Sequence, residues 1–270
     1  MNPTDLTTEM VRQWIQVMRA RGLAPATVKS QVKLIKAILD IGVSEALLDT
    51  NAAKTLKLSG GSSTGYKPFT SKQVHQIFQA TAEANIDYQY WLPRIGLYTG
   101  ARIEELAQLT SEDVCEVEGI KCIWMKHEPD AEYPKQLKGK LRNERQVPIH
   151  PWLLEIGFYD FAKKPGQGRI FKGNGTVTKN TIGPSASRWF RLLTTRLGIY
   201  KKHELVFHSF RGTFKDMCRR GGIRGELHDA ITGHSGGLVG ETSYGETLRF
   251  MPKVTSEAIY SLPYPDKLSG

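Results

Sequence analysis

The chain has 270 residues, of which 40% are hydrophobic and 24% are charged, a composition that excludes a disordered or fibrous protein. Lys and Arg number 37 against 27 Asp and Glu, and the formal net charge of +10 favours a polyanionic partner. Three cysteines are too few for a disulfide framework. There is neither a secretory signal nor an apolar run long enough to cross a membrane, so we expect a soluble, cytoplasmic protein.

Two amphipathic helices are predicted within residues 1–58. The first, at residues 7–20, has an apolar stripe formed by Val11, Trp14, Ile15 and Met18. The second begins near Pro25, which suits a first helical turn, and its apolar stripe is formed by Val28, Val32, Ile35 and Leu39. We therefore expect a small helical domain at the start of the chain.

A row of lysines lies on another face of the second helix. Lys29, Lys33 and Lys36 recur at helical spacing. Such a row is either a solvated surface or a face that contacts phosphates, and the spacing by itself favours the solvated surface.

A linker is expected at residues 59–66, because the segment SGGSSTG is small, flexible and without periodicity. Residues 67–270 would then form the second domain. The first 65 residues carry a net charge of +3 and the remainder +7. Both parts are basic, as a clamp on nucleic acid would require.

The second domain is predicted to be mainly helical. Thr70 and Gln73 have capping-box spacing and open one helix, and a further helix runs to the turn at Gly100. Ile103 and Leu106 begin another amphipathic helix. Later in the chain, one periodic set predicts a helix from Trp189, Phe190, Leu193 and Leu197.

A small antiparallel sheet is expected among these helices. Residues 114–125 contain β-branched and aromatic residues on both sides of a turn at Glu118 and Gly119, which predicts a hairpin. Residues 145–149 could add a third strand, and Pro148 indicates that this strand lies at an edge or is about to end. The fold class is therefore mainly α with a small antiparallel sheet (α+β), in two domains.

Four separated segments carry side chains suited to phosphate chemistry. They are TGARIEEL at 99–106, KLRNERQVPI at 140–149, HSFR at 208–211 and TGHS at 232–235, with Tyr244 ten residues after His234. Arginine's planar guanidinium grips phosphate oxygens bidentately and stays charged. No acidic cluster with metal-ligand spacing and no GxxxxGK loop is present, so we expect no metal and no nucleotide cofactor. Each segment alone is a weak signal, since a lone HxxR is commonly a surface helix pair.

Together, in this order and spacing, the segments resemble the tyrosine recombinases (phage integrases and Xer-type chromosome recombinases). The resemblance covers about residues 65–262, and the segment RGLAPATVKSQVKLIKAILD resembles their helical core-binding domain. That domain is short here, so we expect the chain to be truncated at its N-terminus, without an arm-binding domain. With this resemblance in view, the lysine row becomes a candidate DNA-backbone contact.

The resemblance implies a mechanism. Arg102 and Arg211 would clamp the scissile phosphate, and His208 and His234 would donate hydrogen bonds to it. Tyr244 would attack, forming a 3′-phosphotyrosine without metal or ATP. Tyr260 and Tyr264 are rival tyrosines near the C-terminus.

Lys140 is the implied general acid for the leaving 5′ oxygen, on a β-hairpin before the strand. The long segment 126–139 offers Lys135 and Lys138 as rivals. Glu105 would support the site by orienting its neighbours.

The implied partner is duplex DNA with inverted recognition sites, bound by a tetramer in the nucleoid, with accessory DNA-bending or directionality proteins. The segment 252–262 is predicted to be a short helix that packs into a neighbouring protomer. Two alternatives remain: a type IB topoisomerase-like enzyme that relaxes DNA, and a DNA-binding protein with an inactive site.

Overall fold

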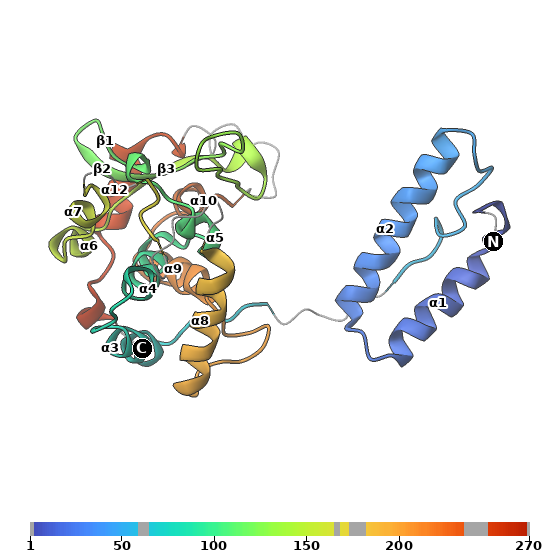
Figure 1. Ribbon diagram of the computed structural model, residues 1–270, viewed down its shortest axis with the longest axis horizontal. Coiled ribbons are helices and arrows are strands. Elements are labelled where there is room, and N and C mark those ends of the chain that lie inside the picture. Colours follow the sequence, from blue (N-terminus) through green and yellow to red (C-terminus); the bar gives the residue numbers. More distant parts are fainter. Residues whose placement is uncertain (1–2, 59–64, 165–167, 173–181, 235–247, 269–270) are drawn as a thin grey trace. The chain divides into compact units, whose positions relative to one another are not determined.

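The computed structural model describes residues 3–58, 65–164, 168–172, 182–234 and 248–268. The chain divides into two compact units, Met1–Thr64 and Gly65–Gly270 (Figure 1). The fold is mainly helical with one small antiparallel sheet, so the predicted fold class is confirmed. In the described part of the chain, no helix has both the length and the apolar character needed to cross a membrane.

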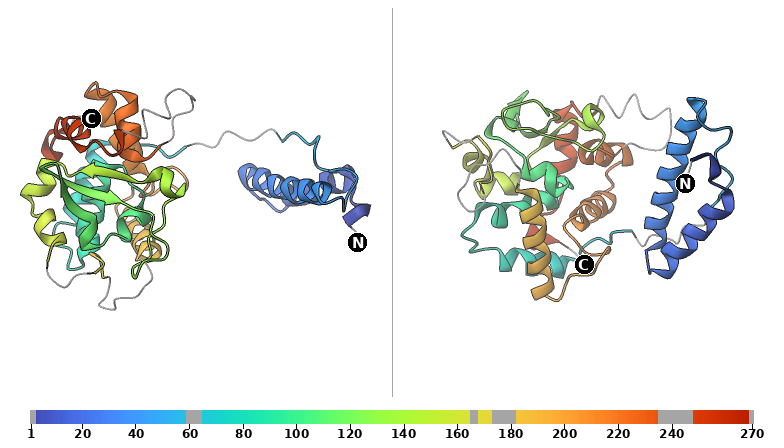
Figure 2. Two further views of the ribbon diagram at one scale, coloured as in Figure 1. Left: turned by 90° about the horizontal axis from the view of Figure 1, so that it is seen from above. Right: turned by 45° about the vertical axis from the view of Figure 1, so that its right-hand side comes forward.

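The first unit is a pair of helices with residues 48–58, which include turns at 52–55, packed against them. After a short 3-10 helix at Pro3–Asp5, α1 spans Thr8–Ala20 and α2 spans Pro25–Ser44, and the two lie side by side (Figures 1 and 2). The Thr7 side chain caps α1 by accepting from the Met10 N–H. The core consists of Val11, Ile15, Met18, Val28, Val32, Leu39 and Ala53.

The second unit contains a three-stranded antiparallel sheet in the order β1-β2-β3. Strand β1 (Val114–Val117) and strand β2 (Ile120–Met125) form the predicted hairpin, and both turn residues have positive φ. Strand β3 (Arg145–Pro148) pairs with β2 and forms an edge, as Pro148 predicted. A long connection, residues 126–144, joins β2 to β3.

The rest of the described part of the unit is mainly helical. The helices are α3 (Ser71–Ala80), α4 (Asp87–Thr99), α5 (Ile103–Ala107), α6 (Pro151–Glu155), α7 (Phe158–Ala162), α8 (Gly183–Arg196), α9 (Ser209–Arg220), α10 (Gly225–Thr232) and α12 (Pro252–Tyr260). The predicted capping box of Thr70 and Gln73 opens α3. The central α4 is buried throughout residues 91–99 and packs against α9. The site described below lies around the C-terminal end of α4.

The C-terminal segment corrects one expectation. The predicted helix is present as α12, but it packs against β2, β3 and α10 of its own unit. Ala258, Ile259 and Leu262 all belong to that unit's core. Beyond the helix, the Tyr98 hydroxyl donates to the Pro263 carbonyl oxygen at 2.9 Å. The buried residues of α12 are therefore covered within its own unit.

Candidate active site

Four of the predicted residues come from three segments of the second unit. Arg102 immediately precedes α5, His208 precedes α9, Arg211 lies in the first turn of α9, and His234 follows α10. Burial, followed by the positive charges of Arg211 and Arg102, lowers the pKa of His208 to about 4. Burial also lowers the pKa of His234, with the charges of Lys215, Arg211 and Arg102 adding to the effect. The fold thus brings these side chains into one electropositive region.

Arg211 is held at the meeting point of two helix C-termini. Its Nη1 donates to the Gly100 carbonyl oxygen at 3.1 Å, beyond α4, and to that of Thr232 at 2.5 Å, at the end of α10. The partial negative charge of helix C-termini favours a cation there. Arg211 is only 6% exposed, and burial followed by the charges of Arg102 and Arg145 lowers its pKa to about 10.

One nitrogen of the Arg211 guanidinium makes no hydrogen bond to the described residues. That nitrogen, Nη2, is also buried. A buried donor without a partner is costly, so an anion that accepts from Nη2 would be bound favourably. This atom is the clearest single sign of an anion site.

Two glycines permit this convergence. Gly100 and Gly233 end α4 and α10 with φ of 57° and 65°, the left-handed region that favours glycine. A Cβ on Gly100 would lie 2.9 Å from Thr232 Cγ2, and one on Gly233 would lie 2.9 Å from Arg145 Nη1. Any larger residue would push apart the segments that carry the arginines.

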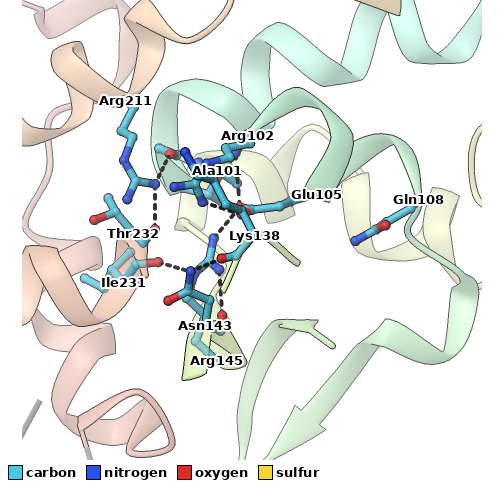
Figure 3. Close-up of polar contacts among 12 residues, drawn as sticks. Ala101, Arg102, Glu105, Gln108, Lys138, Asn143, Arg145, Arg211, Ile231 and Thr232 are labelled. Atoms are coloured by element: carbon cyan, nitrogen blue, oxygen red, sulfur yellow. Dashed lines mark hydrogen bonds and ion pairs between the residues drawn. The ribbon is translucent and has the colours of Figure 1, made fainter. Parts of the chain in front are cut away.

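Glu105 lies beneath the site and binds two arginines. Its Oε1 accepts from Arg102 Nη1 at 2.6 Å, and its Oε2 accepts from Arg145 Nη2 at 2.7 Å (Figure 3). Burial would raise the pKa of this carboxyl, but the charges and hydrogen bonds of Arg145 and Arg102 outweigh it and hold the pKa at about 2. Glu105 is therefore ionised and orients Arg102, whose side chain remains 25% exposed.

Arg145 is a structural arginine that the sequence analysis did not identify. It is the first residue of β3 and is 0% exposed. Besides Glu105, it donates from Nε to the Ile231 carbonyl oxygen at 2.7 Å and from Nη1 to that of Asn143 at 2.9 Å. The only sequence signal was an arginine leading into an apolar strand.

The three candidate lysines of the β2–β3 connection have different surroundings. Lys135 is buried, with its Nζ 2.7 Å from Asp113 Oδ1 and 2.8 Å from Glu128 Oε2. Burial would lower the pKa of Lys135, but these hydrogen bonds and charges outweigh it and raise the pKa. The Lys135 ammonium is therefore engaged in holding the connection to the body of the unit.

Lys138 and Lys140 are exposed instead. The charge of Lys138 is the smallest of the contributions that lower the pKa of His208. The Lys138 backbone lies beside Asn143, near Glu105 (Figure 3). Lys140 does not lie on a strand. It begins a 3-10 helix, Lys140–Asn143, with a positive φ of 55°, and lines a surface hollow beside His127.

The predicted nucleophile, Tyr244, lies outside the described residues. Of its rivals, Tyr264 donates its hydroxyl to Glu155 Oε1 at 2.6 Å, and Tyr260 is a partly exposed residue at the end of α12. The Tyr264 hydroxyl is therefore engaged by a carboxylate, and Tyr260 belongs to a helix that packs on the sheet.

The lysine row of the first unit divides in two. Lys29 and Lys33 are exposed on α2. Lys36 donates from Nζ to the Leu56 carbonyl oxygen at 2.6 Å and to that of Lys54 at 3.2 Å. Lys36 therefore ties residues 54–56 to α2, which leaves Lys29 and Lys33 as the solvent-facing lysines of this row.

The whole fold is similar to that of solved integrases. A lambda integrase dimer bound to a COC′ core site matches with a TM-score of 0.67 and 15% identity, over 92% of this chain and 81% of that chain. The Tn1549 transposon integrase in complex with a circular intermediate DNA matches with a TM-score of 0.65 and 15% identity, over 94% and 85%. A lambda integrase tetramer bound to a Holliday junction matches with a TM-score of 0.65 and 16% identity, over 87% and 66%.

No protein-family model matches the chain, and no curated protein matches its sequence. The chain nevertheless has the fold of the tyrosine-recombinase integrases. The resemblance predicted from the motifs is thus confirmed at the level of the fold.

Proposed function

We propose that the chain is a site-specific DNA recombinase that cleaves and rejoins duplex DNA through a 3′-phosphotyrosine at Tyr244. The observation that carries the proposal is the buried, uncommitted Nη2 of Arg211 in a region where other cations help to depress the pKa of His208 to about 4. A phosphodiester carries the charge and the acceptor oxygens that such a region lacks.

In this mechanism Arg102 and Arg211 bind the non-bridging oxygens, where negative charge grows in the transition state. His208 is neutral at pH 7, so one ring nitrogen can accept the Tyr244 proton while the other donates a hydrogen bond. His234 donates a further hydrogen bond to the phosphate. The tyrosine oxygen bonds to phosphorus as the bond from phosphorus to O5′ breaks, and a 5′-hydroxyl later reverses the exchange.

A lysine of the β2–β3 connection supplies the proton to the leaving O5′. Lys140 is the candidate favoured by the motif, whereas the small electrostatic effect of the Lys138 charge on the pKa of His208 favours Lys138. Lys135 is the weakest candidate, since its ammonium is buried between two carboxylates.

The proposed substrate is duplex DNA with inverted recognition sites, bound by protomers that assemble as a tetramer. The lambda integrase tetramer bound to a Holliday junction supports this assembly by similarity of fold. The basic character of both units supports binding of the DNA backbone.

A covalent-capture experiment tests the proposal. A nicked duplex from which the cleaved end diffuses away should trap the wild-type chain on DNA, and Tyr244→Phe should bind the same DNA without forming the covalent complex. Peptide mapping should locate the DNA on Tyr244, and a link at Tyr260 or Tyr264 would refute the assignment. Covalent capture with relaxation of supercoiled DNA by a monomer would favour the topoisomerase alternative. Binding without capture would favour the inactive DNA-binding protein.

A further inference from the structure

Gln108 makes an unusual pair of hydrogen bonds with the β2–β3 connection. Gln108 follows α5 directly and is 4% exposed. Its Oε1 accepts from the Gln136 backbone N–H at 2.8 Å, and its Nε2 donates to the Gln136 carbonyl oxygen at 3.1 Å. The side-chain amide thus binds both polar groups of one backbone residue, as a neighbouring strand would.

Gln108 and Glu105 hold the two ends of one loop, which we define as residues 136–145. Glu105 binds Arg145 at the C-terminal end, and Gln108 binds Gln136 at the N-terminal end. Residues three apart share one side of a helical turn. The short segment that presents Arg102 therefore also holds both ends of the loop that presents Lys138 and Lys140.

The loop is closed by further hydrogen bonds at its base. His127 Nδ1 accepts from the Leu137 N–H at 3.2 Å, while the backbone N–H of His127 donates to Glu144 Oε1 at 2.8 Å. Between residues inside the loop, the Asn143 side chain donates to the Lys138 carbonyl oxygen. Since the loop is braced internally, a change at its base would displace both exposed lysines together.

We propose that Gln108 is a positioning residue that sets where the lysine of this loop meets the leaving O5′. The inference rests on the proposed function. Proton delivery requires heavy atoms within about 2.6–3.2 Å of each other. A misplacement of about 1 Å can cost roughly 10²-fold in rate. Gln108 touches no reacting atom, and it acts only through Gln136.

The test compares two DNA substrates cleaved by the full-length chain. One has the natural O5′ at the scissile position, and the other has sulfur there, a leaving group that needs no proton. Gln108→Leu should slow cleavage of the oxygen substrate by roughly 10- to 100-fold. It should change cleavage of the sulfur substrate by less than about threefold, because the phosphate clamp and nucleophile are untouched.

Gln136→Ala is the matched control. Gln108 binds only the backbone of Gln136, whose side chain is exposed, so this variant should cleave both substrates at the wild-type rate. Gln108→Glu provides a second variant of nearly equal volume that keeps the acceptor and loses the donor. It should show the same preference for sulfur, because one carboxylate oxygen would face the Gln136 carbonyl oxygen that Nε2 now binds.

Equal loss on both substrates for Gln108→Leu and Gln108→Glu would overturn the inference, because the residue would then support the whole site. Wild-type rates on the oxygen substrate would overturn it as well. Sulfur rescue of the double variant Lys138→Ala/Lys140→Ala provides the reference. If that variant were rescued and the Gln108 variants were not, only the inference would fail. If wild-type protein formed no covalent complex with either substrate, the proposed function would fail.

Discussion

Arg145 Nη2 donates to Glu105 Oε2 across 2.7 Å, between an arginine with no exposed surface and a glutamate that is 2% exposed. The same carboxylate binds Arg102, and the same guanidinium binds the carbonyl oxygen of Ile231 in α10. This ion pair and its neighbouring hydrogen bonds therefore join the edge of the sheet, the segment TGARIEEL and the helix that leads to His234.

Arg145→Met should destabilise the protein strongly. The change leaves a buried carboxylate short of a partner and frees the Ile231 carbonyl oxygen, and breaking a buried pair costs about 3–5 kcal/mol. Arg102→Met is the control, since that side chain is 25% exposed and Glu105 would keep Arg145. Urea unfolding should show a clearly smaller loss of stability for Arg102→Met, and equal losses would contradict the central role of Arg145.

The three lysines should respond differently to the sulfur substrate. Removal of the general acid should slow cleavage of normal DNA by roughly 10²–10⁴-fold, and sulfur should restore most of that rate. We expect this rescue for Lys138→Ala or Lys140→Ala. Lys135→Ala should instead lower the free energy of unfolding, because Asp113 would lose its partner at 2.7 Å. If sulfur rescued only Lys135→Ala, the general acid would be Lys135.

Ile259→Ala should destabilise an isolated monomer. Ile259 is 0% exposed within its own unit, and truncating such a side chain typically costs about 2–5 kcal/mol. Because α12 packs in its own chain, the drop in stability should not depend on protein concentration. A drop that grew with concentration would indicate that the helix docks on another protomer.

Acid should weaken the fold through His150. Its Nδ1 accepts from the Trp152 N–H and its Nε2 donates to the Leu262 carbonyl oxygen, so the neutral ring suits both partners. Burial lowers its pKa from 6.5 to about 4, although Leu262 and Glu155 oppose this. Between these values the unfolded chain binds more protons, so the free energy of unfolding should fall as pH falls, by roughly 3–4 kcal/mol at most.

His150→Gln should flatten that pH dependence in urea titrations. His208, whose pKa is also lowered to about 4, should account for part of the slope that remains. An unchanged slope in His150→Gln would show that His150 does not titrate in this way.

DNA binding should weaken steeply with salt, and Lys29 and Lys33 should contribute to that steepness. If either lysine binds a phosphate, its substitution with Ala should reduce the slope of log affinity against log salt by about 0.9. Lys36→Ala should instead loosen the segment that its Nζ binds at Leu56. A flat salt titration of the wild-type chain would contradict binding of the DNA backbone by both units.

The sequence by itself determined those features that depend on nearby residues. The apolar stripes of α1 and α2, the capping box at Thr70 and the hairpin turn at Glu118 are set by spacing and local backbone preference, and each is found as predicted. The arginine and histidine motifs could be recognised for the same reason, since each is a short contiguous stretch of sequence.

Only the tertiary structure decided how distant side chains are paired. Gln108 and Gln136 are 28 residues apart, and Arg145 and Ile231 are 86 apart, so no local pattern links them. The packing of α12 within its own unit could not be predicted either, because an apolar helical face does not specify what covers it. Lys135 looked equivalent to Lys138 in sequence, yet burial between two carboxylates separates them. Burial and long-range electrostatics depend on which surfaces meet, and that is settled only when the chain has folded.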